Sequence, residues 1–236
     1  MKKLTKGFTL VELLVVIAIL GILMGALVPN IMAAIAKSQM TAMEANGKKI
    51  AEALIAESAE GDDLWPRGTK DASQDNDDDE IYKQQSSATE YFKLLFDVTK
   101  QKESKWRPYI DGKLLESLWG NGVTPAKPGA LEKQNVAWCI VAGASGIDNI
   151  PALITRNIDV KSGSFLTSGQ QDYSSNKDEL TFSSTYPQPF GEKGCVIIMK
   201  DGSAKKLEAR KCTYREVYNR RTISLPDSVQ LEYLEP

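Results

Sequence analysis

The chain has 236 residues, of which 42% are hydrophobic, and its formal net charge is −2. This length predicts one folded domain behind an N-terminal helix, and the nearly balanced charge gives no global preference for nucleic acid. The sequence contains no histidine, which excludes histidine general-base catalysis, Ser-His-Asp and Cys-His arrangements and imidazole metal sites. We therefore predict that the chain is not an enzyme.

The N-terminus combines a basic leader with an apolar run that holds a single acid. Residues 2–6 contain three lysines and are followed by Gly7. Phe8 opens the apolar run, and Glu12 is its only charged residue as far as Pro29. A carboxylate at the middle of a bilayer costs roughly 2.5–3.5 kcal/mol. We therefore expect Glu12 to have a partner of opposite charge.

The sequence Gly7-Phe8-Thr9-Leu10-Val11-Glu12, with the apolar run behind it, resembles the N-terminus of type IV pilins and of the pseudopilins of type II secretion systems. The resemblance implies that a prepilin peptidase cleaves after Gly7 and methylates the new N-terminal residue, Phe8. It also implies that Glu12 pairs with the N-terminal amine of a neighbouring subunit during assembly. Two opposite charges offset each other's desolvation only when they meet.

Two other interpretations of the N-terminus stay open. In the first it is a secretory signal, with Ala34-Ile35-Ala36 as a small-residue cleavage site. In the second, Leu13–Val28 is a plain single-span anchor of a periplasmic protein, and neither Gly7 nor Glu12 has a role. An anchor and a pilin share one orientation across the cytoplasmic membrane, because the basic leader stays inside and the chain after about residue 37 lies outside.

One continuous helix is predicted over residues 8–60, after a leader of residues 1–7. Residues 8–36 form its transmembrane or filament-core half, and residues 37–60 are amphipathic. Apolar residues recur with a helical period across the two halves, at Ile31, Ile35, Met43, Ile50 and Leu54. By resemblance to pilins, Gly21 and Pro29 match positions where the helix loosens or kinks for assembly. Proline within a helix removes one hydrogen bond and bends the axis.

A loop and helix insert is predicted over residues 61–134. Its acidic run places Asp75, Asp77 and Asp79 at the first three ligand positions of a calcium-binding EF-hand loop. Glu80 then replaces the required glycine and Ser86 the final glutamate, so we predict a solvated acidic loop and no cofactor, with calcium as the alternative. Short helices are expected over two stretches, Thr89–Lys100 and Leu114–Trp119.

Residues 135–236 are predicted to be mainly β-structure within an extracytoplasmic head that spans 61–236. Strands are expected over Val136–Val141 and Ala152–Thr155. A hairpin joins Cys195–Met199 to Ala204–Ala209 through a two-residue Asp201-Gly202 connection. Gly163–Ser175 is polar and rich in turn residues.

Three cysteines lie in the part of the chain predicted to be outside, where disulfides persist: Cys139, Cys195 and Cys212. The register counted from the hairpin turn sets Cys195 opposite Glu208, so Cys139 on a neighbouring strand is as good a partner for Cys195 as Cys212. The pairing stays open, as does a simple role for all three as small buried hydrophobes.

Seven basic residues gather near the C-terminus: Lys205, Lys206, Arg210, Lys211, Arg215, Arg220 and Arg221. They are interpreted as a solvated face, with a partner surface or a DNA contact as alternatives.

The fold predicted overall is α+β and pilin-like, with a long N-terminal helix packed on an antiparallel sheet and an enlarged loop and helix insert. The predicted function is that of a filament subunit of a type II secretion or type IV pilus-like system. Its expected partners are the prepilin peptidase, sister subunits and an inner-membrane assembly platform. The alternative is a minor tip pilin whose large head is an adhesin or a DNA or substrate receptor.

Overall fold

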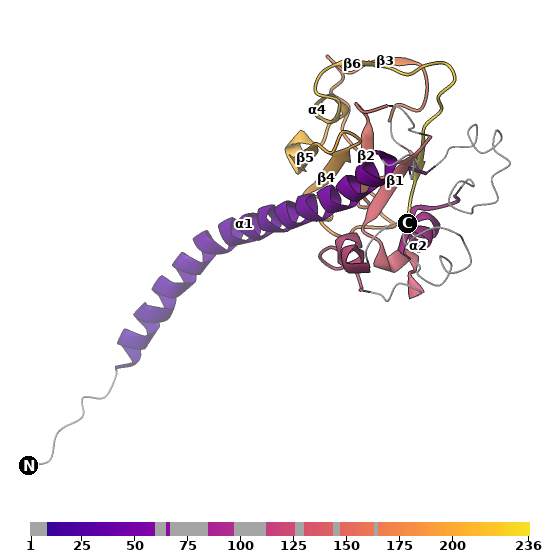
Figure 1. The fold of residues 1–236 in the computed structure, drawn as a ribbon. Coiled ribbons are helices and arrows are strands. Elements are labelled where there is room, and N and C mark those ends of the chain that lie inside the picture. The colour runs from indigo at the N-terminus through magenta and orange to yellow at the C-terminus, as the bar shows by residue number, and fades with distance from the viewer. Residues whose placement is uncertain are drawn as a thin grey trace, which may run out of the picture. The chain divides into compact units, whose positions relative to one another are not determined.

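The chain, in the computed structural model, divides into two compact units, residues 1–38 and 39–236. Figure 1 shows its elements in chain order. The residues that the structure describes are 9–59, 65–66, 85–96, 112–125, 130–143, 147–162 and 165–236. The candidate processing residues and the acidic run lie outside these stretches: Gly7, Phe8, Asp75, Asp77, Asp79 and Glu80. What is predicted for them stays a prediction.

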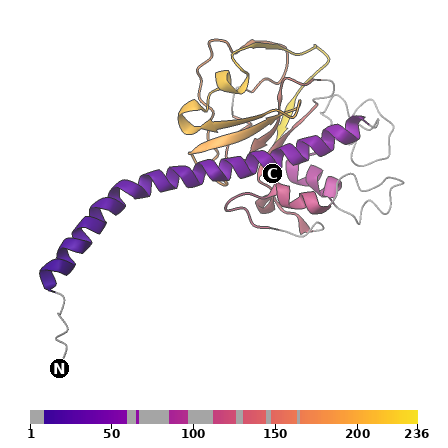
Figure 2. The ribbon, with the colours of Figure 1, turned by 60° about the vertical axis from the view of Figure 1, so that its left-hand side comes forward.

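Helix α1 (Leu10–Ala59) is 50 residues long and contains Pro29. Figure 2 shows it as one continuous helix. Proline has no N–H, so one carbonyl of the preceding turn loses its helical donor. Asn30 follows, and its Nδ2 donates to the carbonyl of Ala26 at 3.2 Å. The amide nitrogen of this side chain therefore has an acceptor within its own helix.

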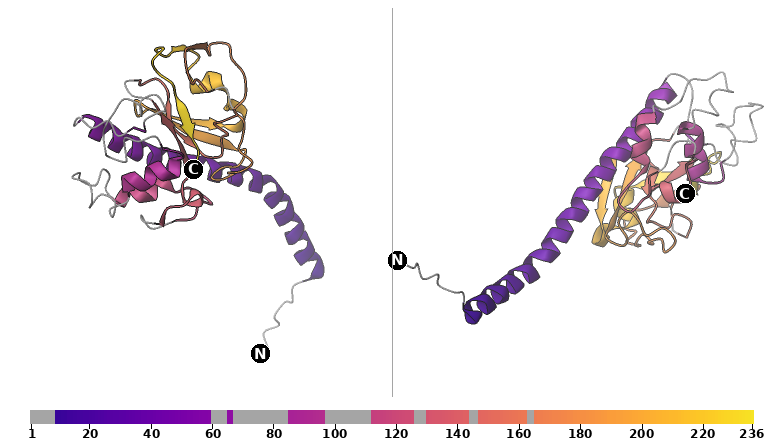
Figure 3. Two further views of the ribbon diagram at one scale, coloured as in Figure 1. Left: turned by 90° about the vertical axis from the view of Figure 1, so that its right-hand side faces the viewer. Right: turned by 90° about the horizontal axis from the view of Figure 1, so that it is seen from below.

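The second half of α1 belongs to the head, and its apolar side chains enter the core. Met43, Ile50 and Leu54, which recur with the predicted helical period, are buried. Between them lies Gly47, where a Cβ atom would stand 2.6 Å from Cγ1 of Ile198 and 2.7 Å from the Trp138 ring. The absence of a side chain at this position therefore allows the helix to approach the sheet closely. The views of Figure 3 show this half of the helix running along the sheet.

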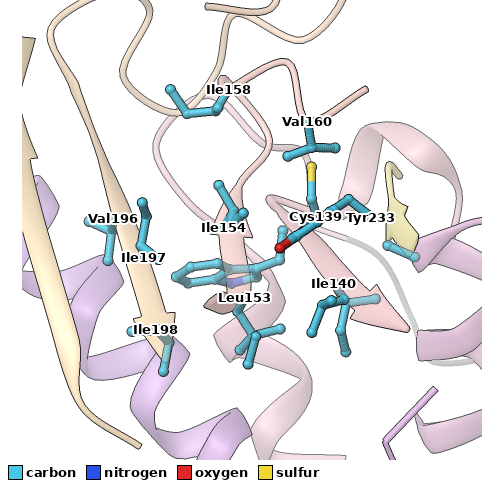
Figure 4. Packing of buried hydrophobic residues seen from close by; sticks show 14 of the residues in the cluster. Cys139, Ile140, Leu153, Ile154, Ile158, Val160, Val196, Ile197, Ile198 and Tyr233 are labelled. Atoms are coloured by element: carbon cyan, nitrogen blue, oxygen red, sulfur yellow. The ribbon is translucent and has the colours of Figure 1, made fainter. Parts of the chain in front are cut away.

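The head is built on a five-stranded antiparallel sheet with the strand order β5-β4-β2-β1-β7. Its strands are β1 (Trp138–Ala142), β2 (Pro151–Thr155), β4 (Gly194–Met199), β5 (Ala204–Glu208) and β7 (Glu232–Leu234). Every residue of β1, β2 and β4 is buried, which explains why these strands are continuously apolar rather than alternating. Figure 4 shows part of the core that they form. The predicted α+β fold, a long helix with an antiparallel sheet, is confirmed.

A second sheet of two short strands pairs β3 (Gln170–Asp172) with β6 (Thr222–Ser224). The sequence predicts only polar turns around β3, so this strand is a difference from the prediction. Both strands have exposed, polar ends around one half-buried residue. Three residues are too few to establish an alternating pattern, and the pairing depends on a segment about fifty positions away.

Short helices complete the described head. Helix α2 (Ala88–Phe96) occupies most of the first predicted stretch and buries the aromatic side chains of Tyr91, Phe92 and Phe96. Gly112–Leu118 forms the 3-10 helix η2 where the second helix is predicted. Near the C-terminus, η5 (Ala209–Lys211) and α4 (Tyr214–Val217) follow β5, and η4 (Lys133–Asn135) precedes β1.

The β4–β5 hairpin exists as predicted, but its register is shifted by one residue. Cys195 pairs with Leu207 and not with Glu208. The N–H of Gly202 donates to the carbonyl of Met199 at 3.0 Å, and the φ of Gly202 is +81°. A turn followed by a left-handed residue makes a three-residue connection instead of a two-residue one. The predicted register is therefore wrong, although the two strands and the turn sequence are correct.

Candidate functional site

The first turn of α1 is closed by reciprocal hydrogen bonds between Thr9 and Glu12. The Glu12 N–H donates to Thr9 Oγ1 at 3.3 Å. In return, the Thr9 N–H and hydroxyl both donate to Oε2 of Glu12, at 2.8 and 2.7 Å. This is a capping box, in which a residue before the helix and the third helical residue satisfy each other's N–H groups. Glu12 therefore has a fixed place at the start of the helix.

Thr9 is a site residue that the sequence interpretation misses. The signal is present in the sequence, because a threonine three residues before a glutamate, ahead of an apolar run, is typical of a capping box. Because Glu12 is a charged residue within an apolar run, the sequence predicts a partner for it on another chain. In the structure, the first partner of this carboxylate is the residue three positions before it.

The unit formed by residues 1–38 presents apolar side chains to its surroundings. The exposed large hydrophobic residues between Leu10 and Ile35 occur on all sides of the helix, and each is 45–79% exposed. In the rest of the described chain, Ile55 is the one further exposed large hydrophobic residue. By length and composition the helix that begins at Leu10 contains a stretch apolar enough to cross a membrane. So large an apolar surface needs lipid or another protein to cover it.

Two glycines lie on this apolar helix with the spacing Gly-x-x-x-Gly. A Cβ atom at Gly21 or at Gly25 would meet no atom within 4 Å. Among the described residues of its own unit, no neighbour therefore requires a glycine at either position. Small residues four positions apart in an apolar helix allow the backbone of a second helix to approach closely. The sequence interpretation singles out Gly21 and misses its pairing with Gly25.

Residues 2–28 match the family model described as the prokaryotic N-terminal methylation motif. This motif is the processing signal of type IV pilins and pseudopilins. The chain carries a prepilin signal. The match spans the basic leader, the Thr9–Glu12 capping box and the start of α1 as far as residue 28. No curated protein and no solved structure matches the chain.

The prepilin signal indicates a type IV pilin-like precursor, which is a structural subunit rather than a member of an enzyme family. It implies processing by a prepilin peptidase and assembly with other pilin subunits. Together with the apolar helix it indicates a protein anchored in a membrane by a single span.

Behind the prepilin signal, the second half of α1 is linked to the sheet by ion pairs of Glu44. Its Oε2 lies 2.8 Å from Nζ of Lys206 on β5, and its Oε1 lies 2.9 Å from Nζ of Lys48, one turn along the helix. The side chain of Glu44 is only 19% exposed. The hydrogen bond with Lys206, and to a smaller extent the one with Lys48, lowers the pKa of Glu44.

Several of the C-terminal basic residues have partners inside the head. Lys205 donates to the carbonyls of Glu216 and Val217 and to Oδ1 of Asn219, and therefore caps the C-terminal end of α4. Its burial lowers the pKa of Lys205 to about 8. Arg220 lies 2.9 Å from Glu216. These contacts reduce the charge that the cluster presents to a polyanion.

The three cysteines are all buried, and two of them lie together. The Sγ atoms of Cys195 and Cys212 are 3.7 Å apart. Cys139 lies on β1, where it is buried opposite Ile154 of β2. Among the described residues, no group of three or more His, Cys, Asp or Glu side chains is placed to hold a metal ion. The weak calcium candidates Asp75, Asp77 and Asp79 lie outside those residues.

Proposed function

We propose that the chain is the precursor of a pilin-like filament subunit of a type II secretion or type IV pilus-like system. It enters the cytoplasmic membrane with its basic leader inside and its head outside. The prepilin peptidase cleaves after Gly7 and methylates Phe8, and an assembly platform moves the subunit into a filament. The observation that carries the proposal is the prepilin signal over residues 2–28, placed on a helix whose apolar residues are exposed.

The apolar half of α1 supplies the driving force for assembly. Its large apolar side chains between Leu10 and Ile35 are exposed. Lipid covers it in the membrane, and sister helices must cover it once the subunit leaves the membrane. Gly21 and Gly25 favour this packing, because both leave open space where a second helix can approach.

Glu12 sets the register between subunits in this proposal. Both hydrogen bonds from Thr9 go to Oε2, and among the described residues no donor contacts Oε1. That oxygen is available to the methylated amine of a neighbouring subunit. The pairing offsets the cost of keeping a carboxylate in the apolar filament core. Thr9 holds the carboxylate in place until the neighbour arrives.

The first experiment is the intact mass and N-terminal sequence of the protein from its native membrane. A start at Phe8 with one added methyl group is the expected result. A start at Met1 would identify an uncleaved membrane anchor, and a start at Lys37 would identify a secreted protein. Either of these two results overturns the proposed assembly pathway.

Two substitutions separate processing from assembly. Gly7→Leu should block cleavage, because the peptidase must accommodate a small residue beside the scissile bond, and Gly7→Ala is its matched control. Glu12→Ala should leave insertion and cleavage unchanged and strongly reduce filament yield. Filaments at the normal level in Glu12→Ala would show that Glu12 does not set the register.

A further inference from the structure

Cys195 and Cys212 form a buried pair of thiols that links two elements of the head. Cys195 lies in β4, and Cys212 directly follows η5. Their Sγ atoms are 3.7 Å apart, and the side chains are 0% and 2% exposed. The sulfur of Cys212 also lies 3.4 Å from the carbonyl of Leu207 and 3.5 Å from that of Glu208.

The turn after β5 is what brings the second cysteine back to the first. The observed register sets Cys195 beside Leu207. The short helix η5 then reverses the chain, and the N–H of Cys212 donates to the carbonyl of Ala209 at 3.3 Å. A pair separated by 17 positions in the sequence thus becomes adjacent in space. The hairpin register counted from the sequence does not bring the two cysteines together, because it does not include this reversal.

The third cysteine is excluded from the pair by the strand order. β2 lies between β1 and β4, and Cys139 pairs with Ile154, which in turn pairs with Ile197. Figure 4 shows Ile154 between Ile197 and Cys139. Two strand spacings of about 4.8 Å separate β1 from β4. A disulfide needs Cα atoms within about 7 Å of each other, so Cys139 cannot reach Cys195.

We infer that Cys195 and Cys212 form a disulfide in the mature subunit. This inference rests on the proposed function, because that function places the head outside the cytoplasm. The oxidant is the disulfide of a thiol oxidoreductase in that compartment. The thiolate of one cysteine attacks this disulfide and forms a mixed disulfide. The second thiolate then attacks the sulfur of the first. The oxidoreductase leaves as a dithiol, and the subunit has lost two protons and two electrons.

Both thiols of the pair lie in the hydrophobic core of the folded head. Neither sulfur is accessible in the packed head. The bridge therefore forms before β5 and η5 close over β4. A head that has folded with both thiols reduced reacts slowly with any external oxidant.

The disulfide would fix the edge strand of the sheet that contacts α1. β5 is an edge strand, and it carries Lys206, the partner of Glu44 on the helix. A covalent link from β4 to the residue after η5 encloses all of β5 in one ring. The edge strand then keeps its register, and the helix keeps its partner, when the subunit is pulled from the membrane into a filament.

The test measures thiols and mass on the protein from its native membrane, unfolded in denaturant without reductant. We expect one alkylated cysteine, Cys139, and a mass lower by two hydrogen atoms than that of the reduced chain. A peptide that joins Cys195 to Cys212 should be recovered from a non-reducing digest. Three alkylated cysteines in a subunit that begins at Phe8 would overturn the disulfide and leave the proposed function intact. A bridged chain that begins at Met1 would instead overturn the processing and leave the disulfide intact.

Variants give a second measurement of the same bridge. Cys195→Ser and Cys212→Ser should each lower the melting temperature of the oxidised subunit by about 6–12 °C, the shift expected when a loop of this length is opened in a chain of this size. Adding reductant should lower the melting temperature of the wild type and leave that of both variants unchanged. Cys139→Ser is the matched control, because its response to reductant should equal that of the wild type. A response to reductant in either bridge variant would contradict the assigned pairing.

Discussion

Gly47 of α1 lies against the ring of Trp138 of β1 with no room for a side chain. A Cβ atom at position 47 would be 2.7 Å from the ring and 2.6 Å from Ile198 on β4. Glycine is a poor helix former, about 1 kcal/mol less favourable than alanine. Its presence in the middle of α1 is explained by the close approach of helix and sheet, which an added methyl group would prevent.

We therefore predict that Gly47→Ala destabilises the head although it improves helix propensity. The methyl group forces Trp138 or Ile198 to move, and such overpacking costs about 1–3 kcal/mol. Denaturant unfolding of the full chain in detergent, followed by tryptophan fluorescence, measures the change. Lys49→Ala, at an exposed position two residues along the same helix, is the control and should be nearly neutral. A variant with alanine at 47 that is as stable as the wild type would contradict the close contact.

The elements that the sequence predicts well are those with a strong local pattern. α1 and α2 follow the helical period, and β1, β2 and β4 are continuous apolar runs. The register of the hairpin fails because it depends on the conformation of one residue. The sequence Asp201-Gly202 fits both a two-residue and a three-residue connection, and only the left-handed φ of Gly202 within the folded turn selects the longer one.

The sequence predicts only part of the candidate site, because only some of its residues stand out from their local pattern. Glu12 is conspicuous because its charge conflicts with an apolar surrounding. Thr9 is uncharged and does not stand out, although its spacing from Glu12 is typical of a capping box, and the structure shows its hydroxyl bound to the Glu12 carboxylate. The meeting of Cys195 and Cys212 is non-local, since it depends on the chain reversal after β5. No periodicity in the sequence marks that reversal.

Glu44 should give the head a dependence on acid pH. Lys206 and Lys48 lower its pKa in the folded state below the usual 4.5. Around that pH the unfolded chain binds more protons than the folded chain at this residue. The stability that Glu44 contributes is therefore complete above about pH 4.5 and is lost as the pH falls through the lowered pKa.

Glu44→Gln should consequently reduce stability at neutral pH and flatten its decline at acid pH. The free energy of unfolding measured between about pH 7 and pH 3 tests both effects. Glu52→Gln, an exposed glutamate of the same helix, is the matched control and should follow the wild-type curve. Parallel curves for Glu44→Gln and the wild type would show that the ion pair with Lys206 adds no stability.

The turn between α4 and β6 contains two consecutive non-glycine residues in the left-handed region. Asn219 has φ of +54° and Arg220 has φ of +58°. Asparagine tolerates this conformation at the end of a helix, whereas for other residues it costs about 1–2 kcal/mol. The ion pair of Arg220 with Glu216 is 61% exposed on the arginine side and offsets little of this cost.

Arg220→Gly should therefore stabilise the head, by about 0.5 kcal/mol after the greater freedom of glycine in the unfolded chain is subtracted. Arg221→Gly supplies the comparison, because Arg221 does not have a positive φ. That variant should lose about 0.5–1 kcal/mol. Thermal unfolding of both variants measures the difference, and a loss of stability in Arg220→Gly would mean that the arginine side chain outweighs the backbone strain.

Thr9 provides the sharpest test of how Glu12 is positioned. Thr9→Val keeps the shape of the side chain but removes the hydroxyl that donates to Glu12 and accepts from its N–H. Loss of such a cap costs about 0.5–2 kcal/mol at the start of a helix. We expect the first turn of α1 to fray, the carboxylate to lose its fixed place, and the filament yield to fall. Cleavage after Gly7 should stay at the wild-type level.

Thr9→Ser keeps the hydroxyl and is the matched control, so its filament yield should equal that of the wild type. Intact mass reports cleavage, and the sheared filament fraction reports assembly, so the two effects are read separately in each variant. If Thr9→Val assembled as well as Thr9→Ser, the capping box would be a feature of the helix alone. Glu12 would then reach its partner without help, because the amine of the neighbouring subunit would be sufficient to orient the carboxylate.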